Sequence, residues 1–423
     1  MNKTFKKMNM KKLNLFTLLF IIVAFAACKK ENSSTNLNNL SYSPNSTTKE
    51  KTDLENTGIA MVSQMSDLNN QPGMQATVNL LYLAAQYSGA LSSEPSPAFG
   101  TLKAVAALGN GKGNVEGIFS RLRQTSDDID LVELYDSIAG TYTYDFNTGG
   151  FDKTASSTFS VKFPATLTDK NDSLNTGVFE IAKPTVQTGP FTFGSSTISE
   201  LPTYIQYDIK VNGVTALNYT FTGAYNSDGM PTSVTSTLTI GTFVFATSWS
   251  YSTASVSLNY SITDSSTTIL GIGWTMTGNF DKTNIQNFSN SQNPDPTTIL
   301  TNSNAYFQFY NIKIAGQIDF KDFYNGMISL EKESTDSVPQ SQVITLINNN
   351  IALVVVYANT NQMIAKADPY YNSTGELSIR LVFADKSKVD LSTYFQSGFD
   401  KLTGDFNTFL SELQSTYGIS NSK

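Results

Sequence analysis

The feature that most constrains the fold of this chain is an alternation of apolar and polar residues between about residues 138 and 276. Apolar residues occupy every second position in successive short stretches, among them Tyr142–Phe146, Phe159–Phe163 and Ile205–Val211. Neighbouring side chains of a β-strand point to opposite faces, so this period of two predicts strands with one apolar face. Asn212-Gly213 separates two such stretches and is a strong signal for a hairpin turn. The pattern therefore predicts a large antiparallel β-meander.

Helical spacing of apolar residues precedes and follows this region. Thr52–Glu55 fits a capping box that opens a helix running to about Leu68, and a second helix is expected from Met74 to Tyr87. Near the end of the chain an apolar stripe comprises Phe395, Phe399, Leu402, Phe406, Phe409, Leu410 and Leu413. We therefore expect an α+β protein, with a curved sheet or half-barrel flanked by N-terminal helices and a C-terminal amphipathic helix.

The sequence also predicts how the chain is divided. We expect a signal peptide (1–27), a lipidated flexible tether (28–50), a helical segment (51–137), the β-meander (138–330), and further strands with the C-terminal helix (331–423). Residues 138–423 can equally form one domain. Further strands are expected over Tyr306–Phe320, Ile351–Ala358, Met363–Ala367 and Leu377–Phe383, and loops over Asn284–Thr297 and Ser334–Gln342.

Composition excludes several kinds of chemistry. The 423 residues include no histidine and one cysteine, so histidine-based catalysis, thiol–histidine pairs, disulfides and His- or Cys-ligated metals are not available. We expect no cofactor. The net charge is −7, and without the five signal-peptide lysines 23 basic and 35 acidic residues remain. Such an acidic surface disfavours nucleic acid as a partner.

A lysine-rich start leads into an apolar run from Leu13 to Ala27, which ends at the single cysteine. This run is short for a membrane span, which needs roughly 20 apolar residues, and is typical of a secretory signal. Phe25-Ala26-Ala27-Cys28 resembles the lipobox of bacterial lipoproteins. The resemblance implies that the Cys28 thiol receives a diacylglycerol, that the preceding peptide is cleaved, and that the new amine is acylated, for example with palmitate. The alternative is an ordinary signal peptide in which Cys28 is a free thiol.

The residue after the cysteine bears on the location of such a lipoprotein. In Gram-negative lipoproteins an aspartate at that position favours retention at the inner membrane, and here the residue is Lys29. The resemblance therefore implies an anchor in the outer membrane, in either the periplasmic or the surface leaflet.

A calcium-loop frame provides the candidate metal ligands. Asp169, Asn171, Ser173 and Glu180 fall at ligand positions of that frame, while Leu174 stands where the frame needs glycine. The alternative is a polar loop between strands.

Acidic residues also cluster at Asp127, Asp128, Asp130, Glu133 and Asp136. This cluster fits either a carboxylate pair or calcium site, or the solvated start of a helix.

Two further features allow structural or functional interpretations. Trp249 and Trp274 lie in the apolar register of the strands, which favours a place in the core over stacking on a sugar. Three Asp-Ser-aliphatic triplets, at 136–138, 172–174 and 336–338, resemble the acceptor pattern of a bacterial O-glycosylation system, and Asp-Ser is also ordinary turn chemistry.

Three functions fit these observations. The preferred one is a non-enzymatic, lipid-anchored envelope protein that binds a lipid or another hydrophobic ligand between sheet and helices, since the order of its elements resembles periplasmic lipid- and lipoprotein-carrier half-barrels. The second is an envelope lipoprotein that binds a glycan or a protein at its surface. The third is a carboxylate-based hydrolase, such as a glycosidase.

Overall fold

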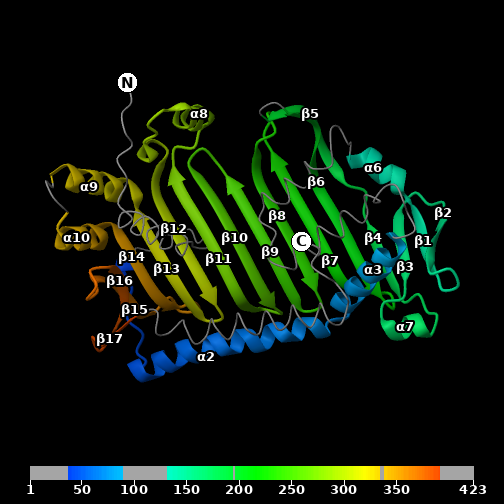
Figure 1. Cartoon of the computed structure of the whole chain (residues 1–423), viewed down its shortest axis with the longest axis horizontal. Helices are drawn as coiled ribbons and strands as arrows, with labels where there is room; N and C mark the ends of the chain where they lie inside the picture. The colour runs from blue at the N-terminus through cyan, green and yellow to red at the C-terminus, as the bar shows by residue number, and fades with distance from the viewer. Residues whose placement is uncertain (1–36, 89–130, 194–195, 334–337, 391–423) are drawn as a thin grey trace. The chain divides into compact units, whose positions relative to one another are not determined.

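The computed structural model describes residues 37–88, 131–193, 196–333 and 338–390 (Figure 1). This part of the chain contains seventeen strands, nearly all paired antiparallel, together with several helices. The predicted α+β class with a β-meander is therefore confirmed. The described residues form two compact units: unit 1 contains those up to Gln64 and those from Thr247 onward, and unit 2 contains those from Met65 to Ala246.

The described part of unit 2 contains strands β1 to β8 and the helices α3, α6 and α7. Its elements are η2 (Asp67–Asn70), α3 (Pro72–Ser88), α6 (Leu131–Ile138), β1 (Gly140–Asp145), β2 (Gly150–Thr154), β3 (Phe159–Phe163), α7 (Leu167–Asn171), β4 (Gly177–Ile181), β5 (Thr185–Phe193), β6 (Ser196–Val211), β7 (Val214–Tyr225) and β8 (Pro231–Ile240). β1 pairs antiparallel with β2 and parallel with β3, and β4 to β8 continue antiparallel around the long strand β6. β9 (Phe243–Tyr251) spans the boundary between the units.

The expected hairpin and the second expected helix both lie in unit 2. Asn212 and Gly213 form the turn between β6 and β7 with φ angles of 51° and 79°, the left-handed region that these residues tolerate. Helix α3 packs against β6, β7 and β8 and buries Leu80 and Leu83. At its start Gly73 lies so close to the β7 backbone that an added Cβ would come within 2.2 Å of the Ala216 carbonyl oxygen. Only glycine allows this approach of helix to strand.

Unit 1 contains the second run of strands. Its elements are η1 (Leu37–Asn39), α2 (Thr47–Ser66, up to Gln64), β10 (Ser255–Asp264), β11 (Thr267–Gly278), α8 (Lys282–Asn290), η3 (Pro296–Thr298), β12 (Leu300–Phe309), β13 (Ile312–Asp319), α9 (Phe320–Glu333), α10 (Gln340–Asn350), β14 (Ile351–Tyr357), β15 (Met363–Tyr371), β16 (Leu377–Phe383) and β17 (Lys388–Asp390). From β10 to β17 each strand pairs antiparallel with the next.

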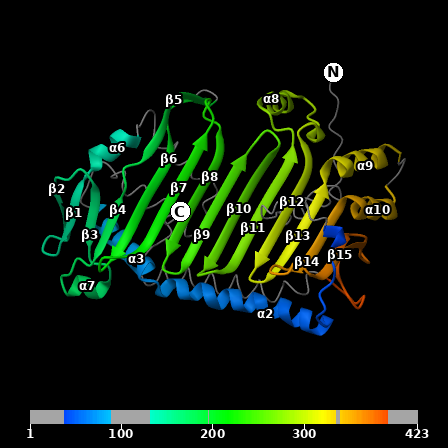
Figure 2. The same cartoon turned by 180° about the vertical axis from the view of Figure 1, so that it is seen from behind.

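Two clusters of buried side chains form the core of unit 1 around β13, β14 and β15. One joins Ala315, Val354, Val356 and Met363 to the partly buried Leu37 and Leu40. The other joins Ile318 of β13 to Phe323 of α9 and to Val343 and Ile347 of α10. These helices bury the apolar residues of the strand ends, and both views place them beside β13 and β14 (Figures 1 and 2).

The structure corrects several expectations for unit 1. Strand was expected over Tyr306–Phe320, and the structure divides this range between β12 and β13, with a turn at Tyr310-Asn311. Helix α8 replaces the first half of the loop expected over Asn284–Thr297, because the Asp281 side chain accepts a hydrogen bond from the Asn284 amide (2.9 Å) and caps the helix. Helix α10 begins inside the second expected loop.

Of the flexible tether expected over residues 28–50, the structure describes residues 37–50, and these make defined contacts. Tyr42 forms a parallel bridge with Met363, the amide of Ser43 donates to the Met363 carbonyl (2.8 Å), and α2 begins at Thr47. Backbone pairing to β15 therefore holds residues 41–43, which composition alone marks as polar linker. The expected C-terminal helix and Cys28 lie outside the described residues. No helix within the described ranges has the length and apolar content required to cross a membrane.

A matched pair of leucines tests the core of unit 2. Leu217 is 2% exposed and Leu174 is 51% exposed. We expect Leu217→Ala to lower the free energy of unfolding by about 2–5 kcal/mol, because it leaves a cavity, and Leu174→Ala to change it by about 0.5 kcal/mol or less. Denaturant unfolding of both variants measures this. Equal losses would contradict the assignment of β7 to the core.

Candidate functional site

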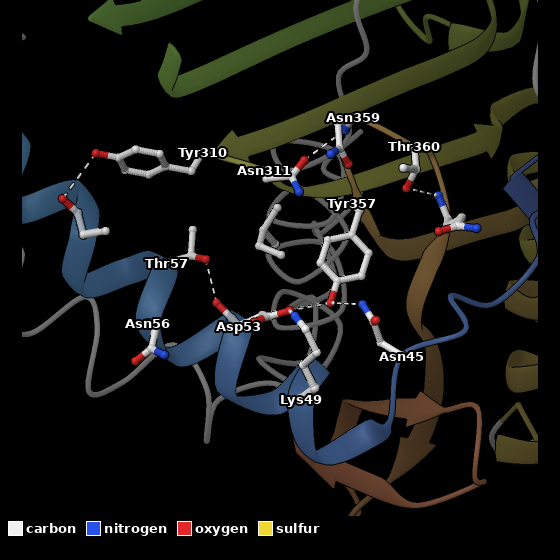
Figure 3. Close-up of a pocket in the computed structure, with 13 residues that line it drawn as sticks. Asn45, Lys49, Asp53, Asn56, Thr57, Tyr310, Asn311, Tyr357, Asn359 and Thr360 are labelled. Carbon is white, nitrogen blue, oxygen red and sulfur yellow. Dashed lines mark hydrogen bonds and ion pairs between the residues drawn. The ribbon is translucent and has the colours of Figure 1, made fainter.

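A pocket of about 540 Å³ lies in unit 1, where α2 meets the turns at one end of the strands (Figure 3). Its lining residues come from three places in the chain. They are Asn45, Lys49, Asp53, Asn56, Thr57 and Ala60 from α2 and the residues before it; Tyr310, Asn311 and Ile312 from the β12–β13 turn; and Tyr357, Asn359, Thr360 and Gln362 from the β14–β15 turn. Most of these side chains carry an amide, hydroxyl or charged group.

A hydrogen-bonded network centred on Asp53 joins α2 to β14. The Tyr357 hydroxyl donates to the Asp53 carboxylate (2.7 Å), and the Lys49 ammonium, one helical turn away, approaches the same oxygen at 2.5 Å. The Asn45 side-chain amide donates to the Tyr357 hydroxyl (3.2 Å). Figure 3 shows the four side chains converging on one side of the pocket.

This network shifts the pKa values of both Asp53 and Tyr357. Partial burial raises the pKa of Asp53, but hydrogen bonds from Lys49 and Tyr357 outweigh it, so the pKa is lowered overall. Burial and the hydrogen bond to Asp53 raise the pKa of Tyr357 to about 12. Near neutral pH the pocket therefore carries an ionised carboxylate held by a neutral phenol and an ammonium group.

Tyr310 adopts an unusual backbone conformation at the pocket. Its φ angle is 47°, a region that bulky side chains rarely occupy. Its hydroxyl donates to the Ala60 carbonyl (3.3 Å) and to the Gln64 side chain, and Gln64 in turn donates to Asp264 at the end of β10 (2.6 Å). Contacts to α2 thus hold a ring whose backbone would otherwise favour another conformation.

The two turns opposite α2 are also fixed by hydrogen bonds. The Asn359 backbone amide donates to the Asn311 side-chain oxygen (3.0 Å), and the Ala358 amide donates to the Asn311 carbonyl (2.7 Å). Asn311 therefore ties the β12–β13 turn to the β14–β15 turn. The amide groups along this side of the pocket have set positions, as a preformed binding site requires.

Two of the four candidate calcium ligands, Asp169 and Glu180, bind partners within the protein. Asp169 completes a capping box at α7, where its carboxylate accepts from the Thr166 amide (3.0 Å) and from the Thr176 hydroxyl (2.7 Å). Glu180 accepts from Lys210 (2.6 Å). Asn171 ends α7, and Ser173 takes a left-handed conformation with a φ angle of 57°. These contacts suit the alternative of a polar loop, and calcium binding remains a prediction.

Other residues singled out in the sequence have structural contacts where the structure describes them. Asp136 in α6 pairs with Lys183 (2.7 Å). The Trp274 indole donates to the Ser303 hydroxyl (3.0 Å) and packs against Ala305, while Trp249 stacks with Tyr251. Asp127, Asp128 and Asp130 lie outside the described residues.

Within the described ranges, no group of three or more acidic, histidine or cysteine side chains is placed to hold a metal ion. No protein-family model matches the sequence, and no curated protein matches it.

Sequence reasoning did not identify this pocket. Asn311, Asn359 and Thr360 lie in turns, where such residues are common for reasons of local geometry, and Asn45 falls in the segment expected to be a tether. Nothing in the sequence indicates that these separate turns meet α2.

Removing the Tyr357 hydroxyl tests the network. Its hydrogen bond to the ionised Asp53 is partly buried, so we expect Tyr357→Phe to lower the free energy of unfolding by about 1.5–3 kcal/mol at neutral pH. The loss should shrink at acidic pH, where Asp53 is protonated. Tyr370→Phe is the control, since Tyr370 makes a similar bond to Asp390 in an exposed setting (2.6 Å) and should show a smaller loss. Equal losses in unfolding experiments would contradict the proposed role of Asp53.

Proposed function

We propose that this protein is a non-enzymatic, lipid-anchored protein of the bacterial cell envelope that binds a hydrophilic, sugar-like ligand in the α2 pocket. The observation that carries the proposal is the composition of the pocket. Amide, hydroxyl and charged side chains from α2 and two turns line it, and hydrogen bonds within the protein hold several of them in place.

This lining suits a carbohydrate. Asparagine and glutamine side chains both donate and accept hydrogen bonds, as sugar hydroxyls do, and the Asp53 carboxylate can accept bonds from such hydroxyls. Tyr310 and Tyr357 add aromatic surface beside the polar groups. A few fixed polar groups together with aromatic surface give orientation and specificity in small-ligand sites.

The proposal favours the second function expected from the sequence over the first. An acyl chain needs an apolar cavity, whereas most of the side chains around the α2 pocket carry an amide, hydroxyl or charged group. The apolar side chains of β13, β14 and β15 pack against Leu37, Leu40, α9 and α10 as core. Carriage of a hydrophobic ligand and carboxylate-based hydrolysis remain predictions from the sequence, and neither gains support from these contacts.

The anchor is a separate part of the proposal. It rests on the lipobox-like Phe25–Cys28 segment, with the outer membrane favoured by Lys29. Replacing Cys28 by serine should move the protein from the membrane fraction to the soluble fraction of the envelope. Retention of the variant in membranes, measured by fractionation and immunoblotting, would overturn lipid anchoring while leaving the pocket proposal intact.

Ligand binding is tested by a glycan array on purified residues 29–423, followed by calorimetry on any glycan that binds. Asn56 lines the pocket from the exposed side of α2. We expect Asn56→Ala to weaken binding about tenfold, through loss of about 1.4 kcal/mol of hydrogen bonding. Asn287→Ala is the matched control, because Asn287 is also an exposed helical asparagine but lies outside the pocket. An array without binders, or equal effects of both variants, would contradict the proposal.

A further inference from the structure

Helix α2 carries a buried carboxyl group in its first turn. Glu50 is 0% exposed, and neither of its carboxylate oxygens has a partner in normal hydrogen-bond geometry, although the Ser43 side chain lies close enough to lower its pKa. An ionised carboxylate in such a place costs several kcal/mol unless a cation or several donors compensate for lost hydration. A group so placed commonly keeps its proton instead.

The groups around Glu50 come from every element that packs on this turn. Tyr42 and Ser43 precede the helix, Lys49 and Asp53 belong to it, Tyr357 comes from β14, and Asp385 comes from the β16–β17 turn. Burial raises the pKa of Glu50 most, and the Ser43 side chain lowers it. The charges of Asp385 and Asp53 raise it and that of Lys49 lowers it, so the pKa is raised overall.

The nearby cations are engaged elsewhere. The Lys49 ammonium forms an ion pair with Asp53 at 2.5 Å, and the Lys51 ammonium lies 5.0 Å from the centre of the Phe383 ring. Neither forms an ion pair with Glu50, so loss of its proton would leave a buried negative charge beside two other carboxylates.

Glu50 and the pocket share one helical turn. Residues three or four apart lie on the same side of a helix, so Glu50 and Asp53 both face β14. Asn45, Lys49 and Asp53 line the pocket, and all three lie within five residues of Glu50. Any displacement of this turn therefore moves one wall of the pocket.

We propose that Glu50 is a proton-binding site that controls the pocket: the neutral carboxyl holds the first turn of α2 against β14 and the β16–β17 turn, and deprotonation releases it. The link to ligand binding rests on the function proposed above. The pH-dependent release of the first turn of α2 is independent of that function, because it follows from the burial of Glu50.

The direction of the pH dependence follows from linkage. The pKa of Glu50 in the folded state lies above its ordinary value of 4.5. Its contribution to stability is therefore complete below about pH 4.5 and is lost as pH rises through the folded-state pKa. Between those limits the ratio of docked to released helix turn falls about tenfold per pH unit, since one proton is involved. The pKa of Asp53 is lowered in the folded state, so its contribution to stability is lost as pH falls, and only at more acidic pH.

The test is backbone hydrogen exchange of residues 47–53, with denaturant unfolding, in the full mature chain across this pH range. Glu50→Gln keeps the shape of the side chain and removes the charge. We expect its first-turn amides to be better protected than those of the wild type above the folded-state pKa, with the pH-dependent loss abolished. Glu55→Gln is the matched control, because Glu55 is an exposed glutamate of the same helix, and it should behave as the wild type does.

Asp385→Asn keeps the proposal testable if Glu50→Gln fails to fold. Removing the neighbouring charge should lower the pKa of Glu50 and reduce the pH-dependent loss of protection. Parallel pH profiles for the wild type and Glu50→Gln, or an unchanged profile for Asp385→Asn, would overturn the proposal. These readouts need no ligand, so an empty glycan array leaves the result for Glu50 unaffected. If the exchange profiles contradict the role of Glu50, the proposal of ligand binding is unaffected and is tested separately by the glycan array.

Discussion

The arrangement of the pocket depends on the contact between Asp53 of α2 and Tyr357 of β14. These two residues lie far apart in the sequence, yet a 2.7 Å hydrogen bond joins them. A hydrogen bond to an ionised carboxylate is stronger than one between neutral groups, and here it forms with a buried phenol. With Lys49 and Asn45 it fixes the first turns of the helix beside the β14–β15 turn. The pocket exists because that helix is held there.

Helix α2 carries one ionised and one neutral carboxyl group within four residues. Asp53 stays ionised because Lys49 and Tyr357 bind it, whereas Glu50, buried without a partner in normal hydrogen-bond geometry, favours its neutral form. The contributions of these two acids to stability therefore change with pH in opposite directions: that of Glu50 is lost as pH rises, and that of Asp53 as pH falls. Tyr310, held in a left-handed conformation through contacts to Ala60 and Gln64, ties the next part of α2 to the strand turns.

The sequence predicts the strands of this protein better than its site. Alternation and the Asn212-Gly213 turn locate β3 and the β6–β7 hairpin, because these signals are local and register depends on them. The Tyr310-Asn311 turn was not predicted, since a tyrosine at positive φ is a poor turn signal and only its contacts to α2 compensate. The pocket was not predicted either, because it joins residues from three separate segments. The burial of Glu50 was not predicted either, because it depends on tertiary contacts and Glu50 lies between two lysines in a polar segment.

The central claim, that α2 and the two strand turns form a binding site for a sugar-like ligand, is most directly tested by mapping where a glycan binds. Backbone amide chemical shifts of the mature chain would be followed as an array-selected glycan is added. Our account predicts that the largest changes occur in the Tyr310-Asn311 turn, the Asn359-Thr360 turn and the first turns of α2. Changes confined to other surfaces, with these amides unmoved, would contradict it.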